Sequence, residues 1–150
     1  MTALMFLLML TSTYAASPTR IFNGTQASTG QFPSIAQFAA DLNGQQLHIC
    51  GGSIIGDRWI LTAAHCFMEP GLEKVLEVLI GSTKLFGGTS YGVKTLFKYP
   101  GFNADSGRGD VALLELDRDI KFEDGVVEKA VLAESLPPVG ICQVSESFFR

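Results

Sequence analysis

The sequence predicts an all-β domain of short antiparallel strands, and three observations support that prediction. The 150 residues include 16 glycines and 11 phenylalanines, which suit tight turns and short strands better than long amphipathic helices. Apolar runs of strand length recur from Phe32 onward, and turn-forming residues separate them. With 47% hydrophobic and 17% charged residues, the chain can bury one modest core, so a single domain is expected.

Each apolar run predicts one strand of a small antiparallel barrel or sandwich. The runs cover residues 35–39, 47–55, 59–64, 75–80, 91–97 and 111–116. The turn signals between them include Asn43-Gly44, Gly56-Asp57, Gly87-Gly88 and Pro100-Gly101. Residues 136–140 read Leu-Pro-Pro-Val-Gly, which breaks any regular element, so a linker is expected to leave the domain there.

The N-terminal segment predicts export. Residues 3–10 are apolar but well short of the roughly 20 residues that span a bilayer, and Thr13 and Ala15 permit cleavage after Ala15. Residues 1–15 are therefore predicted to be a signal peptide and the polar segment 16–20 a short propeptide, which makes the protein secreted and extracellular. No Lys or Arg lies near Met1, a departure from the usual pattern, and the alternative is a buried N-terminal helix.

Charge and composition argue against several partners. The chain has 11 Lys+Arg and 15 Asp+Glu, a formal charge of -4, and it has no basic cluster that could neutralise phosphates. We therefore expect no nucleic-acid partner and no membrane partner, and we single out no cofactor and no metal site.

The cysteine count is odd. An exported chain enters an oxidising compartment, where cysteines are expected to pair as far as their number permits. With Cys50, Cys66 and Cys142, one must stay free, join another chain or have lost its partner with a missing segment.

Three segments carry the functional information. They are Cys-Gly-Gly-Ser-Ile-Ile at 50–55, Trp-Ile-Leu-Thr-Ala-Ala-His-Cys at 59–66 and Gly-Asp-Val-Ala-Leu-Leu-Glu-Leu at 109–116. Together they resemble the chymotrypsin family of trypsin-like serine proteases, over Arg20 to about Val144. The junction Arg20-Ile21 is similar to the activation cleavage site of that family, where a cut after a basic residue frees a small hydrophobic N-terminus.

The resemblance implies an antiparallel Greek-key β-barrel over residues 21–137, the first of the two barrels of such a protease. Residues 138–150 would then be the linker and the truncated start of a second barrel, which is missing. The absent part would hold the Gly-Asp-Ser-Gly-Gly nucleophile segment, the oxyanion-hole amides and the specificity pocket, so substrate preference is left open.

The resemblance assigns catalytic roles to two residues. His65 would be the general base that takes the proton of a nucleophile, and Asp110 the buried carboxylate that orients the imidazole. The alternative for His65 is a structural histidine beside a disulfide. His48 has no such flanking sequence and is expected at the surface or at a strand edge.

Residues 108–110 also spell Arg-Gly-Asp, an adhesion tripeptide that would place the chain among binding modules. Such a tripeptide must project from an exposed loop, whereas Asp110 directly precedes an apolar run and is expected to be drawn inward. The family usually has asparagine before this aspartate, so Gly109 is a departure that leaves the carboxylate unchanged.

The resemblance also assigns the cysteines. Cys50 and Cys66 would form the bridge that closes the loop presenting the histidine, whereas the family partner of Cys142 lies in the second barrel. Asn23-Gly24-Thr25 is a glycosylation sequon whose occupancy is left open.

The expected function is that of a secreted trypsin-like serine endopeptidase, present here as a truncated form without the nucleophilic serine. This chain alone is expected to be inactive. Its expected partners are protein or peptide substrates, an activating protease and protease inhibitors. The alternative is a non-catalytic homologue that acts as a binding or regulatory protein.

Overall fold

The computed structural model describes residues 25–135. Several features expected from the sequence lie outside these residues: the signal peptide 1–15, the propeptide 16–20, the cleavage site Arg20-Ile21, the sequon at Asn23, Cys142 and the segment 138–150.

The described residues confirm an all-β architecture. Each of the six apolar runs overlaps one strand: β1 (Ile35–Leu42), β2 (Gln45–Ile54), β3 (Trp59–Thr62), β4 (Leu76–Ile80), β5 (Thr89–Lys98) and β6 (Ala112–Leu116). Two short 3₁₀ helices, η1 (Ala64–Phe67) and η2 (Leu72–Lys74), lie between β3 and β4. The run predicted over 59–64 therefore ends as a strand at Thr62 and continues into η1.

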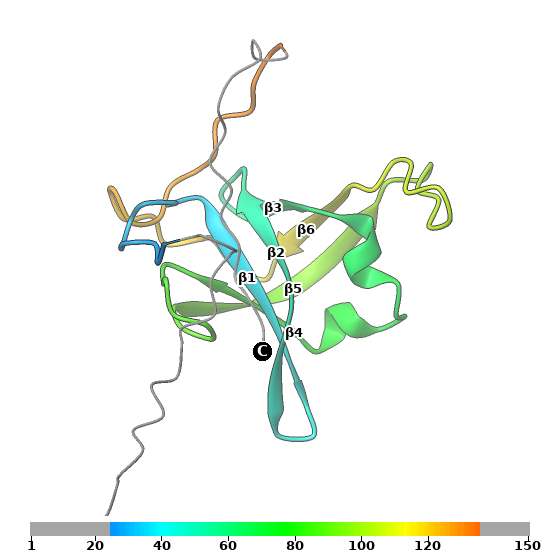
Figure 1. Ribbon diagram of the computed structural model, residues 1–150, viewed down its shortest axis with the longest axis horizontal. Helices are drawn as coiled ribbons and strands as arrows, with labels where there is room; N and C mark the ends of the chain where they lie inside the picture. Colours follow the sequence, from blue (N-terminus) through cyan, green and yellow to red (C-terminus); the bar gives the residue numbers. More distant parts are fainter. Residues whose placement is uncertain (1–24, 136–150) are drawn as a thin grey trace, which may run out of the picture.

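The strands form a closed barrel in the order β1-β2-β3-β6-β5-β4, and every neighbouring pair is antiparallel (Figure 1). Because β4 returns to pair with β1, the order β4-β1-β2-β3 is a Greek key. This confirms the predicted barrel. The closure also removes the free strand edges that an open sheet would expose to other chains.

The barrel interior is filled by alternate residues of the strands. In β6, Ala112, Leu114 and Leu116 are buried and the two residues between them are only half-buried, which is the period of two expected for a strand with one face inward. Phe38 and Tyr91 are the largest buried side chains of β1 and β5. Phe67 adds a ring from η1, with its centroid 6.1 Å from that of Phe38.

One glycine of the Cys-Gly-Gly segment is required by this packing. A Cβ on Gly52 would lie 2.5 Å from Ile60 Cγ2 and 2.9 Å from Phe38 Cζ, closer than carbon atoms can approach. The second glycine therefore lets β2 lie against the core where any side chain would collide.

Candidate active site

His65 lies at one rim of the barrel because the chain turns sharply after β3. Ala63 keeps an extended backbone, and the 3₁₀ helix η1 begins at Ala64, whose side chain is fully buried. The Thr62 hydroxyl donates a hydrogen bond of 2.9 Å to the carbonyl of Gly51 on β2 and so holds the end of β3. The next side chain, His65, points outward and is 57% exposed.

Three contacts of the two residues that follow His65 anchor η1 to the barrel. Cys66 forms a disulfide with Cys50 of β2, with the two Cα atoms 6.2 Å apart. Phe67 is buried against Phe38, and the Lys98 ammonium donates a hydrogen bond to the Phe67 carbonyl. The predicted Cys50–Cys66 bridge is thus confirmed, and His65 is held by a buried neighbour on each side.

Asp110 comes from a different part of the chain, the loop that joins β5 to β6. Gly109 has φ +67, in the left-handed region that glycine and asparagine tolerate best. Glycine in place of the family asparagine can therefore adopt this left-handed backbone conformation. The amide of Val111 donates to the Gly109 carbonyl at 2.8 Å, which tightens the chain just before β6 begins.

The carboxylate of Asp110 contacts His65 twice. The backbone N–H of His65 donates to Asp110 Oδ1 at 2.8 Å, and the ring Nδ1 lies 2.7 Å from Oδ2. The predicted contact between two residues 45 positions apart is therefore confirmed. An ionised carboxylate only accepts hydrogen bonds, so it favours the tautomer with the proton on Nδ1 and leaves a lone pair on Nε2.

The electrostatics of the pair follow from these bonds. The hydrogen bond from the His65 side chain lowers the pKa of Asp110 below its ordinary value of 3.8, and the backbone N–H of His65 lowers it further. Asp110 is therefore charged at neutral pH, as an acceptor for the Nδ1 proton must be.

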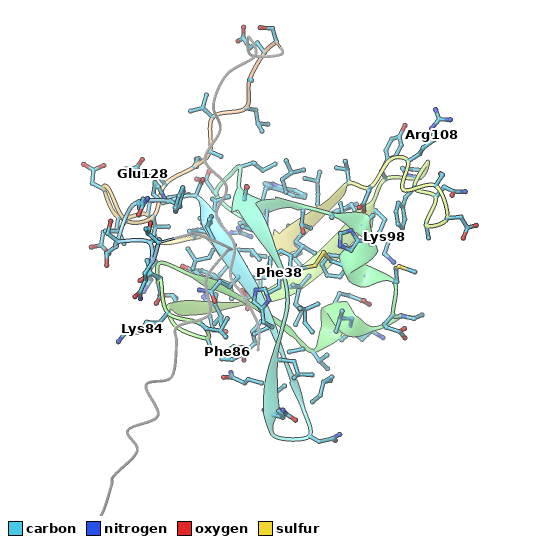
Figure 2. The ribbon with its side chains drawn as sticks, viewed as in Figure 1. Phe38, Lys84, Phe86, Lys98, Arg108 and Glu128 are labelled. Atoms are coloured by element: carbon cyan, nitrogen blue, oxygen red, sulfur yellow. A yellow bond between two sulfur atoms is a disulfide. The ribbon has the colours of Figure 1, made fainter. Side chains whose placement is uncertain are left out.

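Asp110 is less buried than the sequence suggested. Its side chain is 30% exposed, because its partner His65 lies at the open rim of the barrel rather than inside it. The position is nevertheless unlike that of a presented Arg-Gly-Asp tripeptide, since the carboxylate is bonded to His65. Figure 2 shows Arg108 at the end of the β5–β6 loop, directed away from the barrel.

The open nitrogen of His65 has sulfur beside it. Nε2 lies 3.7 Å from Cys66 Sγ, and one donor atom each from Cys50, His65 and Cys66 lies within 4.8 Å of the others. Both sulfurs belong to the disulfide, which ligates metals poorly compared with thiolates. In the oxidised protein the cluster therefore offers one strong ligand atom, the nitrogen.

His48 lies apart from this group. It belongs to β2, pairs in register with Ala39 of β1 and is half-buried, and burial lowers the pKa of its imidazole. It is thus a half-buried residue within a strand, whereas the sequence predicted a position at the surface or at a strand edge.

Sequence reasoning missed the backbone contribution to the site. The amides of Ala64 and His65 both donate toward the Asp110 carboxylate, and Lys98 ties β5 to η1.

Comparisons with known proteins match most of this chain. Residues 21–146 match the family model described as Trypsin. The chain is 35% identical to rat transmembrane protease serine 9 over 132 residues, 84% of this chain and 12% of that protein. It is also 35% identical to bovine coagulation factor XI over 111 residues, 71% of this chain and 17% of that protein.

The chain thus spans less than a fifth of the length of either relative. Within residues 25–135, no helix has the length and apolar character needed to cross a membrane.

Proposed function

This chain belongs to the trypsin family of serine proteases, and from that premise we propose that it supplies the general base and the orienting carboxylate of a secreted endopeptidase. The observation that carries the proposal is the 2.7 Å contact between His65 Nδ1 and Asp110 Oδ2 at the barrel rim. Its substrates would be proteins or peptides, and protease inhibitors would compete for the same site.

In the proposed mechanism, the Nδ1 proton stays on the imidazole, hydrogen-bonded to Asp110, while Nε2 acts on the substrate side. Nε2 accepts the proton of a serine hydroxyl as the oxygen attacks the peptide carbonyl, and it later donates that proton to the leaving amine. The charged Asp110 stabilises the imidazolium between these two transfers. The His65 side chain is 57% exposed, so a nucleophile from another segment can approach the ring.

We expect the nucleophile to come from residues other than these 150. The sequence contains no Gly-Asp-Ser-Gly-Gly segment, which carries the nucleophilic serine in the family. The proposed activity therefore belongs to a protein that joins this barrel to a second one, and the 150 residues alone are expected to be inactive. An activating protease would cut between Arg20 and Ile21.

The proposed roles of His65 and Asp110 can be tested in a chimera that joins this barrel to a second one. Residues 21–146 would be fused to the second barrel of a family relative, and hydrolysis of a peptide panel measured. His65→Ala should abolish turnover, and Asp110→Asn should lower kcat by about 10⁴-fold because the wrong tautomer is favoured. Asp105→Asn, an exposed carboxylate in the same loop, is the matched control and should change little.

A folded chimera whose turnover is unaffected by His65→Ala would refute the proposal. A folded chimera that binds a protease inhibitor but has no activity would favour the alternative, a non-catalytic homologue with a binding role.

A further inference from the structure

The disulfide and the imidazole beside it form the basis for a second, redox-dependent site. Cys50 Sγ, Cys66 Sγ and His65 nitrogen lie within 4.8 Å of one another. In a tetrahedral zinc site with Zn–S of about 2.3 Å and Zn–N of about 2.0 Å, sulfur and nitrogen ligands lie roughly 3.5 Å apart. The observed 3.7 Å from Cys66 Sγ to His65 Nε2 is close to that edge length.

The orientation of the imidazole also suits a metal. Nδ1 is hydrogen-bonded to Asp110, so the lone pair of His65 is on Nε2, the nitrogen that faces the sulfur. Histidine ligands of zinc almost always donate their other N–H to a carboxylate or carbonyl, which fixes the ring and raises its basicity. The carboxylate needed for that arrangement is already in place.

We propose that reduction of the Cys50–Cys66 disulfide creates a zinc site whose ligands are the two thiolates and His65 Nε2, with water in the fourth position. A dithiol reductant supplies two electrons and two protons, becomes a disulfide itself and leaves two cysteine thiols. Zinc then binds as the two thiol protons are released to solvent. His65 is 57% exposed, so water can reach the open position.

This site would control the atom to which the proposed function assigns proton transfer. Zinc on Nε2 occupies the lone pair that would otherwise accept a serine proton, so the reduced, metal-bound form would have no free base. The metal site itself rests only on the geometry of the three side chains, and binding can be measured without any catalytic activity.

The test uses the full chain with Cys142→Ser, which removes the third thiol. The protein is reduced with a dithiol, desalted under argon and titrated with Co²⁺ and then with Zn²⁺ against a chelator. One metal ion per chain should bind. The intensity of the thiolate-to-cobalt charge-transfer band should correspond to two thiolate ligands. The oxidised chain should bind zinc at least about 100-fold more weakly, because thiolates rather than disulfide sulfurs are ligands.

Three variants distinguish zinc binding at this three-ligand site from nonspecific zinc binding by the two thiolates. His65→Ala should weaken zinc binding at least about ten-fold, and Asp110→Asn about 10–100-fold, the usual effect of losing the carboxylate behind a ligand histidine. His48→Ala, the matched control on β2, should not change the affinity. Equal affinity in the wild type and in either the His65 or the Asp110 variant would overturn the proposal.

Circular dichroism follows the fold throughout. If reduction unfolds the barrel, zinc must restore its β-sheet spectrum at one equivalent, because the ligands come together only in the folded chain. Failure of zinc to do so would also overturn the proposal.

Discussion

Trp59 and Phe97 pack together on the outside of the barrel, with ring centroids 5.8 Å apart. They lie on β3 and β5, on either side of β6, and are 36% and 48% exposed. Val111, directly before β6, is 47% exposed as well, so β3, β5 and the residue that precedes β6 each expose a large apolar side chain. Large exposed apolar patches mark surfaces that another element covers or that promote association.

The isolated chain should therefore bind a hydrophobic dye and self-associate. Phe97→Lys should reduce both, because it replaces one ring of the exposed Trp59–Phe97 pair with a charge. Leu42→Lys, a similar change at the distant tip of the β1–β2 hairpin, is the control and should have less effect. Sedimentation and dye fluorescence measure the outcome, and a wild-type monomer without dye binding would contradict the prediction.

The disulfide should contribute to stability more than the third cysteine does. Removing the Cys50–Cys66 bridge by a double Cys→Ala change should lower the free energy of unfolding by about 3 kcal/mol, since the bridge closes a loop of 16 residues. Cys142→Ser should change it little, because Cys142 is predicted to have no partner within the monomer. Chemical denaturation gives both values, and non-reducing peptide mapping would expose a bridge from Cys142 to Cys50 or Cys66.

Gly52→Ala should destabilise the barrel by about 1–3 kcal/mol, the usual cost of forcing extra volume into a packed core. The new Cβ would collide with Ile60 and Phe38. Gln45→Ala, at an exposed position of the same strand, serves as the control. Thermal unfolding of the two variants settles the comparison, and equal stability would show that β2 shifts freely at this point.

The acid stability of the chain should depend on Asp110. Its pKa is lowered in the folded chain, chiefly by the hydrogen bond from the His65 side chain, so this carboxylate stabilises the fold above its ordinary pKa of 3.8. That contribution is lost as the pH falls through the lowered folded value. In Asp110→Asn, the free energy of unfolding should therefore fall less steeply below about pH 4. Denaturant titrations from pH 6 to pH 2.5 test this, with Asp105→Asn as control.

Cleavage after Arg20 should occur without producing an active protease. The segment 16–20 is short and polar and contains Pro18. A trypsin-like enzyme is therefore expected to reach the peptide bond between Arg20 and Ile21. In the family, the new N-terminus pairs with a carboxylate of the second barrel, which is predicted to be missing here. After cleavage and removal of the activating enzyme, a fluorophosphonate probe should not label the chain. Covalent labelling that depends on His65 would show that one of its own serines acts as nucleophile.

The amino-acid sequence by itself determined the strands and the identity of the paired side chains. An apolar run of strand length, such as residues 111–116, is a local property and so predicts a strand without any knowledge of its neighbours. The His65 and Asp110 segments were identified because their flanking residues match a known family. The bridge between Cys50 and Cys66 came from the same resemblance.

Only the tertiary structure decided how deeply the His65 and Asp110 side chains are buried and which atoms surround them. The exposure of Asp110, the amide of Ala64 that faces its carboxylate and the sulfur beside His65 Nε2 depend on how β2, η1 and the β5–β6 loop meet at the rim. The contacts of Asp110 with Ala64 and His65 join residues far apart in the chain, so no local pattern encodes them. Their distances are set by barrel closure, which fixes the position of every strand relative to the others.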